Sequence, residues 1–477
     1  LSGCAVGPDY VAPTTQFAPF HNTITADSQR STTPPPRLDN WWTGFNDPEL
    51  VTVVQRALAQ NLDLKAAFAR VQQARAAASG AGAQLFPTLD LNSTATAEHQ
   101  SLDSPLGSLA KATSPGYSRD QREYTLGAAA SWEIDLAGGL RRNAAAARDE
   151  AAAAEADQLG THITVAADAA DAYLQIRGLQ AQLAVTQDQV DTDVHLLELV
   201  EVRQRAGAAD EREVAQAEAL LKQARAVVPT LRTALEAQLN RLDVLMGAQP
   251  GTYARELSAP GTIPAVPAID DRVTPMDVLR RRPDMIAAER RLAASNERIG
   301  AAISDYYPKI SLSGALGFDS TSPNHFLSAQ AFQPIGSGAL RWRLFDFGKV
   351  DAEVAETRGA NAEALMQYRQ AALKATEDVE NAFVALSQTE TRLQELQGEV
   401  ASLTRARDLS EHAYKAGAIT LTDVLDADRQ LLVARDELDG TRADAARAAV
   451  TVFRAFGGGW DVPPDSRVAE AAQTAVT

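Results

Sequence analysis

The chain has 477 residues, of which 45% are hydrophobic and 6% aromatic, so it can bury a large core and form more than one domain. Its formal net charge of −17 argues against a nucleic-acid-binding surface, because the phosphate backbone attracts basic proteins. Cys4 is the only cysteine, which excludes an intrachain disulfide and a metal cluster held by several cysteines.

The N-terminal sequence "LSGC" has the small residues that precede the cleavage site of a bacterial lipoprotein signal. We therefore expect residues 1–3 to be the remnant of that signal and Cys4 to be the site of lipid attachment. Residues 4–45 then form an extended, lipid-anchored N-terminal segment. The alternative is an unmodified thiol in a chain terminus, and the intact mass of the protein distinguishes the two.

The next region, residues 46–248, combines a short helix, two strands at about 88–98 and 122–136, and a very long helix. The proline-free stretch after the second strand is rich in Ala, Leu, Glu, Gln and Arg, which favour helices. A helix from Gly138 to about Ala206 would be about 100 Å long at 1.5 Å per residue. Abundant alanine is typical of close antiparallel coiled-coil packing, and a solvated filamentous stalk is the alternative.

The second half of the chain repeats the first. Residues 282–312 align with residues 61–91 without a gap at an offset of 221, and identical residues farther along recur at an offset of 210. Among these pairs are Asp63/Asp284, Pro87/Pro308, Gly207/Gly417, Val214/Val424 and Gly247/Gly457. We therefore predict a tandem duplication with a Pro-rich linker at 249–275, a second repeat at 276–459 with strands at about 309–319 and 337–347, and a C-terminal tail at 460–477.

The predicted strands alternate apolar and polar residues. In "YTLGAAASWEIDL" one face carries Tyr124, Leu126, Trp132 and Ile134, and "KISLSGALGF" and "GALRWRL" have the same period of two. Such strands are typical of a transmembrane barrel, although a half-buried sheet in a soluble protein alternates in the same way. No run of 18 uncharged apolar residues predicts a transmembrane helix. Because single-chain bacterial barrels need at least about eight strands, four per chain require several chains to share one barrel.

Each repeat has a predicted helix start just after the glycine of its hairpin turn. "TLTD" matches a capping box with Thr420 at the N-cap and Asp423 three residues later. "DERE" matches it in the first repeat, with Asp210 and Glu213 in the same places. Helix capping is therefore one interpretation of Asp423.

Asp426 does not have that explanation, because its counterpart in the first repeat is Gln216. In a symmetric oligomer, Asp423 and Asp426 would each form a ring of carboxylates, and such rings favour cations and can hold a gate. Repulsion within the rings would raise the pKa values of the carboxyl groups and make opening sensitive to pH. We therefore predict a channel constriction at these residues.

Catalytic motifs are missing from the sequence. The six histidines are scattered and form no H-E-x-x-H pattern, and neither a phosphate-binding loop nor G-x-S-x-G occurs. The glycines of "FGGGW" stand where a helix would end, which a C-cap explains better than a phosphate site. We predict a protein that is not an enzyme, with no metal site and no cofactor beyond a lipid on Cys4.

Several segments together resemble the outer membrane factor (TolC-like) family, and most closely its NodT-type lipoprotein branch, which serves RND-type tripartite efflux systems. These segments are "CAVGPDYVAP", "WWTGFNDPEL", "NLDLKAAFARVQQARA", "WEIDLAGGLRR", "LFDFGKV" and "YKAGAITLTDVLDADRQLL". The resemblance covers nearly the whole chain, from Cys4 to about Trp460. Each motif alone is weak, but the set is specific.

The resemblance implies a mainly α-helical protein with a membrane β-barrel. Four strands from each chain of a homotrimer would make a twelve-stranded barrel, continued by a long coiled-coil tunnel in the periplasm. The implied function is passive conduction of small molecules, such as drugs or other toxic solutes, to the exterior. The implied partners are a periplasmic adaptor (membrane fusion) protein, an inner-membrane RND-type transporter and outer-membrane lipid, without nucleic acid. Type I protein secretion and a trimeric coiled-coil structural or adhesive stalk are the alternatives.

By position, Asp423 and Asp426 resemble the constriction carboxylates of the family, and Tyr414 resembles a tyrosine that helps to close the tip. The turns at Gly207 and Gly417 are the expected docking points for the adaptor. Where some relatives have an arginine two residues after the turn glycine, this chain has Ile419. The residue after Cys4 is alanine and not the aspartate associated with inner-membrane retention, which favours the outer membrane.

Overall fold

A computed structural model describes residues 5–14, 18–22, 34–113, 116–270 and 273–460, so Cys4 and most of the C-terminal tail lie outside the described residues. The chain is mainly helical, with one small antiparallel sheet. It divides into two compact units. Unit 1 contains Leu1–Pro13, Gln72–Ala153 and Glu289–Gln367, and unit 2 contains Thr14–Val71, Ala154–Ala288 and Tyr368–Thr477.

The longest helices confirm the duplication. Helices α4 (Gly139–Arg205) and α9 (Lys349–Lys415) each have 67 residues, and both of their ends differ by 210. Helices α5 (Glu211–Leu245) and α10 (Leu421–Ala455) each have 35 residues and differ by the same number. The bounds of α4 agree to within one residue with the helix predicted from Gly138 to Ala206. Alanine-rich sequence without internal proline is sufficient to predict a helix of this length.

The shorter elements complete the two repeats. Helix α2 (Leu62–Ala83) precedes the first strand, and α8 (Pro283–Ile303) precedes the third. The N-cap of α1 (Pro48–Gln60) is Asp47, which accepts hydrogen bonds from two backbone N–H groups of the first turn. The other helices of the described ranges are η2 (Leu38–Phe45), α3 (Pro105–Thr113), α6 (Ala254–Leu257), α7 (Pro275–Arg281), η3 (Ser304–Tyr306) and η4 (Pro323–His325).

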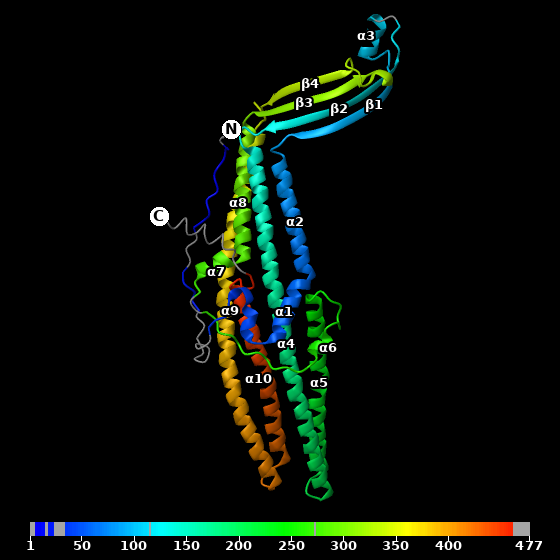
Figure 1. Ribbon diagram of the computed structural model, residues 1–477. Helices are drawn as coiled ribbons and strands as arrows, with labels where there is room; N and C mark the ends of the chain where they lie inside the picture. The colour runs from blue at the N-terminus through cyan, green and yellow to red at the C-terminus, as the bar shows by residue number, and fades with distance from the viewer. Residues whose placement is uncertain (1–4, 15–17, 23–33, 114–115, 271–272, 461–477) are drawn as a thin grey trace. The chain divides into compact units, whose positions relative to one another are not determined.

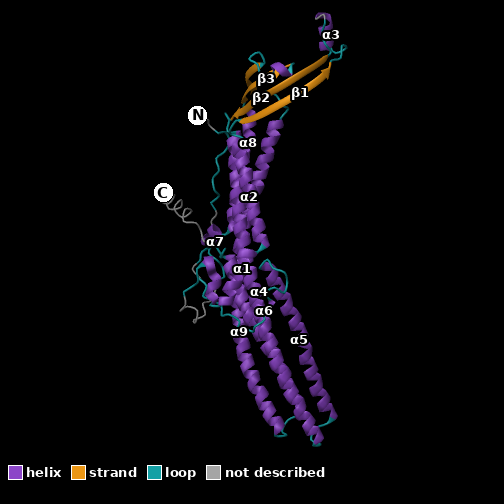
Figure 2. Ribbon diagram, turned by 45° about the vertical axis from the view of Figure 1, so that its right-hand side comes forward, coloured by secondary structure: helices purple, strands orange, loops and turns teal. Residues whose placement is uncertain are grey.

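The sheet of unit 1 has the order β1-β2-β3-β4, and every neighbouring pair is antiparallel (Figures 1 and 2). Its strands are β1 (Thr88–His99), β2 (Asp120–Ile134), β3 (Lys309–Ser320) and β4 (Phe332–Arg341). The register places apolar residues opposite apolar residues, as in the pairs Leu126–Phe318, Trp132–Leu312 and Ile310–Leu340. The predicted alternation therefore becomes a single apolar face across all four strands.

The fourth strand corrects the prediction of 337–347, because it begins at Phe332 and ends at Arg341. The first residue of β3, Lys309, pairs with Arg341, so the residues that follow have no ladder partner in β3. Trp342 instead donates its Nε1–H to the backbone oxygen of Tyr306 at 2.9 Å. Two residues before helix α9, Phe347 has a left-handed backbone with φ of 55°, which ends the extended conformation.

The apolar face of the sheet is exposed in the single chain. Leu91 is 75% exposed, Leu316 is 61% exposed and Leu340 is 66% exposed. The opposite face carries polar pairs, among them Ser313 and Ser337, whose hydroxyl oxygens are 2.7 Å apart. The outer strands, β1 and β4, each pair on one side only within the described part of the chain. An exposed apolar face with two open edges requires cover by lipid or by other protein strands.

The main core of unit 2 surrounds Trp41, whose ring stacks on that of Phe453 with centroids 5.3 Å apart. Alanines of α4 and α10 bring the helices close together, and Ala166, Ala170 and Ala446 are fully buried. These contacts agree with the predicted close packing of alanine-rich helices. None of the helices in the described ranges has an apolar stretch long enough to span a lipid bilayer.

Candidate functional site

Two helical hairpins, α4–α5 and α9–α10, end in similar turns, and both turns belong to unit 2 (Figure 1). Gly207 and Gly417 have φ of 72° and 76°, a left-handed conformation that favours glycine. Each glycine N–H bonds to the carbonyl three residues earlier, at 2.9 Å, and the next N–H bonds to the carbonyl five residues earlier. This pair of hydrogen bonds is the Schellman motif of a helix C-terminus, and both turns have it.

The helices that follow the turns begin differently. Thr420 and Asp423 form the predicted capping box, in which the Asp423 carboxylate accepts from the Thr420 backbone N–H at 3.0 Å and from its hydroxyl at 2.7 Å. In the first repeat, Asp210 accepts from the Glu213 N–H at 2.9 Å. The prediction that Glu213 completes a box was wrong, because its Oε2 is buried without a hydrogen-bond partner in the described structure.

Asp423 and Asp426 are exposed, and each has its own donors. Asp426 accepts from Arg429 at 2.6 Å and from Gln430 at 2.7 Å, one turn along the same helix. Hydrogen bonds from Thr420 lower the pKa of Asp423 below its ordinary value. Within one chain this is opposite to the rise that ring repulsion was expected to produce, because the capping bonds stabilise the charged form.

Tyr414 lies in a small apolar cluster between the two hairpins and is 2% exposed. The guanidinium of Arg203 lies over its ring at 4.3 Å from the centroid. Arg203 also donates to the backbone oxygens of Tyr414, at 3.2 Å, and Ala208, at 3.4 Å. The Tyr414 hydroxyl and the Arg203 Nε are buried without hydrogen-bond partners in the described residues. Burial raises the pKa of Tyr414; the positive charge of Arg203 acts against this rise and the negative charge of Glu213 adds to it.

Gln216 is the first-repeat counterpart of Asp426. Its Oε1 is buried and has no hydrogen-bond partner among the described residues. It lies one turn after Glu213 on α5. The structure therefore brings Arg203, Glu213 and Tyr414 to one cluster, with Gln216 on the adjoining turn, whereas Asp423 and Asp426 lie on the exposed surface of α10.

Sequence reasoning missed a second charged cluster in the same hairpins. Asp193 and Asp428 are 1% and 2% exposed. Arg407 donates to Asp428 at 2.9 Å, and Gln189 donates to Asp193 at 2.8 Å. Burial raises the pKa of Asp193 to about 6, and the nearby charge of Asp428 raises it as well. The sequence did contain one signal for this cluster. Asp428 follows Val424 by four residues and therefore lies on the buried, apolar stripe of α10, where a carboxylate needs a partner.

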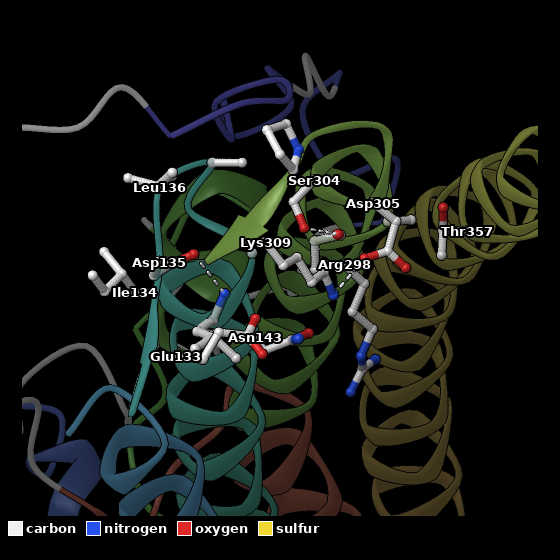
Figure 3. A pocket seen from close by; sticks show the side chains of 16 residues that line it. Glu133, Ile134, Asp135, Leu136, Asn143, Arg298, Ser304, Asp305, Lys309 and Thr357 are labelled. Atoms are coloured by element: carbon white, nitrogen blue, oxygen red, sulfur yellow. Dashed lines mark hydrogen bonds and ion pairs between the residues drawn. The ribbon is translucent and has the colours of Figure 1, made fainter. Parts of the chain in front are cut away.

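A cavity of about 360 Å³ in unit 1 lies where the strands join the helices, and Figure 3 shows the residues around it. Lys309 pairs with Asp305 at 2.7 Å, and Asp135 pairs with Arg141 at 3.1 Å. Arg298 pairs with Glu150 at 2.8 Å. Because these charges are engaged with one another, we assign the cavity to the connection of sheet and helices. No group of three or more His, Cys, Asp or Glu suited to a metal occurs in the described ranges.

Comparison with known proteins places these features in a family. The family profile described as "Outer membrane efflux protein" matches residues 53–248 and 274–458. A pyoverdine export outer membrane protein, OpmQ of Pseudomonas aeruginosa, is 33% identical over 431 residues, covering 89% of this chain and 88% of OpmQ. Nodulation protein T of Rhizobium leguminosarum bv. trifolii is 30% identical over 465 residues, covering 97% and 96%.

A solved structure gives the same result. The structure of the outer-membrane channel OprN has 31% sequence identity and a TM-score of 0.84, covering 96% of this chain and 100% of the OprN chain. The predicted resemblance, the outer-membrane location and the role in efflux are therefore confirmed. The chain, with its two matched repeats and paired helical hairpins, belongs to the outer membrane efflux protein family.

Proposed function

We propose that three copies of the chain form an exit duct through the outer membrane. Four strands from each copy would close a twelve-stranded barrel, and the long helices would continue it as a tunnel in the periplasm. The exposed apolar face of the sheet is the observation that carries this proposal, because lipid outside a closed barrel would cover it. The open edges of β1 and β4 would then pair with neighbouring copies, which removes both edges.

The duct is passive, and its partners supply energy and selection. A periplasmic adaptor protein would dock at the turns of Gly207 and Gly417, where a Cβ atom would meet nothing within 4 Å and the backbone is accessible. An inner-membrane RND-type transporter would supply the driving force. The names of the relatives include export of pyoverdine and efflux of toluene, which supports small molecules as the substrate class. The chain itself would catalyse no reaction.

The gate of the duct would lie at Asp423, Asp426 and Tyr414. In a trimer the exposed carboxylates of α10 would repeat three times around the axis and form a cation-favouring constriction. Tyr414 would act from within the hairpin pair, because it is buried between the two turns and does not face solvent. Glu213 and Gln216 would support the first-repeat side of the same region.

A lipid on Cys4 would add a second attachment to the membrane, since each buried CH₂ group contributes about 0.8 kcal/mol. The intact mass of the protein tests that part of the proposal. Conductance in planar bilayers tests the duct, together with the oligomeric state of the protein in detergent. A trimer that conducts in discrete steps supports the function. A monomer in detergent, or a trimer that carries no current, would contradict it.

A further inference from the structure

Residues 5–9 of unit 1 pack against the N-terminal end of α4 and the C-terminal half of α8. The Val6 N–H donates to the Ala137 backbone oxygen at 3.0 Å. The Asn296 side chain donates to the Pro8 backbone oxygen at 3.0 Å. Arg142 donates to the backbone oxygens of Val6, at 3.3 Å, and Gly7, at 3.4 Å. Successive backbone groups of this segment are therefore paired, as they would be in a bound extended peptide.

Three glycines make the contact possible. Gly7 has φ of 97°, and a Cβ there would lie 2.4 Å from the Cα of Gly300. A Cβ on Gly300 would lie 2.9 Å from both the Val6 oxygen and the Arg142 Nε. A Cβ on Gly138 would lie 2.7 Å from the Cα of Ala5. Since real Cβ atoms do not approach so closely, both the segment and the helices require glycine here.

Arg142 links the segment to the helices. Its side chain is 8% exposed and pairs with Glu297 of α8 at 3.0 Å. It also pairs with Asp9 at 3.0 Å, although Asp9 itself is 93% exposed. A buried guanidinium is costly unless its donors are satisfied. Here Glu297 satisfies part of the group, and residues 6, 7 and 9 satisfy the rest, so the site is complete only when the segment is in place.

We infer that residues 5–9 form a strap, whose seat consists of Gly138, Arg142, Asn296, Glu297 and Gly300. The strap and part of the seat come from "CAVGPDYVAP" and "WEIDLAGGLRR", which are far apart in the sequence and meet here. Cys4 directly precedes the strap in the sequence. Under the proposed function, a lipid on Cys4 is thus held beside the sheet-bearing unit, and is not carried on a free tether.

Hydrogen exchange of the full chain in detergent tests the strap. We expect the Val6 amide to exchange at least about 100-fold more slowly than in an unstructured peptide, because its hydrogen bond breaks only when the strap lifts. Gly300→Ala should accelerate this exchange at least about tenfold. Gly359→Ala is the matched control, because a Cβ at that position of unit 1 meets nothing within 4 Å. It should leave the Val6 rate within about twofold of the wild type.

Asp9→Ala is a milder variant that keeps the helices intact, since Asp9 is exposed. It should accelerate Val6 exchange about threefold or more, while the sheet amides keep their wild-type rates. A wild-type Val6 amide that exchanges as in a free peptide, or equal rates in Gly300→Ala and Gly359→Ala, would overturn the strap. The conductance measurement tests the proposed function separately. If the Val6 amide is protected but the protein carries no current, the proposed duct is refuted and the strap is still supported.

Discussion

The guanidinium of Arg203 lies 4.3 Å from the ring centroid of Tyr414, and the same side chain donates to the backbone oxygens of Tyr414, in the last turn of α9, and Ala208, in the turn after α4. The cation stands at the C-terminal ends of α4 and α9, where the helix dipoles favour positive charge. It therefore connects the two hairpins of one chain through charge, ring and backbone contacts. Arg203 therefore helps to hold Tyr414 in place, together with the apolar cluster around the ring.

Replacing Arg203 with alanine should loosen the tip. A partly buried cation–π contact contributes about 0.5–2 kcal/mol, and two hydrogen bonds are lost with it. We expect single-channel conductance to rise, because the two turns separate more readily. Arg205→Ala is the matched control, since Arg205 donates to the Glu201 backbone oxygen of its own helix. Equal conductance of the two variants would show that Arg203 does not restrain the gate.

The buried Asp193 should make the hairpin packing depend on pH. The folded pKa of about 6 is above the ordinary value of 3.8, because burial disfavours the charged form. Its stabilising contribution is therefore complete below pH 3.8 and is lost as the pH rises through 6. Gln189, Asp428 and Arg407 are the groups that face this carboxyl.

Asp193→Asn should raise stability at pH 7.5 by up to about 3 kcal/mol, since one pKa unit corresponds to about 1.4 kcal/mol. At pH 5 the difference should be about half as large, because the folded carboxyl is mostly protonated there while the unfolded one is still mostly charged. Thermal melting at both pH values measures this, with the exposed Asp191→Asn as control. Melting temperatures that fall in the Asn variant at pH 7.5 would refute the assignment of Asp193.

The stability of the folded protein should depend on Arg407 as long as Asp428 is charged. Arg407→Ala leaves Asp428 buried without its cation, which costs about 3–5 kcal/mol for a buried pair. The double variant Arg407→Ala, Asp428→Asn should recover a large part of that loss, because the uncompensated charge is removed. The exposed pair Arg392–Glu437 gives the control, and Arg392→Ala should change stability by less than about 0.5 kcal/mol. Denaturant or thermal unfolding of the wild type and these three variants measures the losses, and an unrescued double variant would contradict the pairing.

The two faces of β3 should respond differently to a charge. Leu316 lies on the exposed apolar face, and Ala315 lies on the opposite face, which also carries Ser313 and Ser337. A lysine on the lipid face of a barrel costs up to about 2–4 kcal/mol, depending on depth. Leu316→Lys should therefore reduce the membrane-inserted fraction severalfold, and Ala315→Lys should leave it near the wild-type value. Inserted protein is measured by fractionation after reconstitution, and a stronger effect of Ala315→Lys would reverse the assignment of the faces.

The sequence predicted the long helices and their turns because the determining interactions are local. Helix propensity fixes α4 and α9, and left-handed glycines at 207 and 417 fix their ends. The fourth strand was misplaced because apolar and polar residues continue to alternate beyond Arg341, although the partner strand has already ended. Alternation of apolar and polar residues indicates which face each side chain would take in a strand, but the strand forms only where a neighbouring strand supplies hydrogen-bond partners.

The charged groups of the hairpins depend on tertiary contacts and were harder to predict. Asp423 was correctly read as a cap, but the same local pattern failed for Glu213, because burial against the neighbouring hairpin is absent from the pattern. The Asp193–Arg407–Asp428 cluster joins three helices. Residues so far apart in the sequence give no spacing signal, and only the position of Asp428 on an apolar stripe pointed to it.

Single-channel recording from the purified protein tests the central claim, a gated duct through a membrane. Asp423→Asn, Asp426→Asn removes both charges, and asparagine can still cap the helix at position 423 through its side-chain oxygen. We predict discrete conductance steps for the wild-type oligomer and larger steps for the double variant. A correctly assembled oligomer that carries no current, or a double variant with wild-type steps and cation preference, would contradict the account.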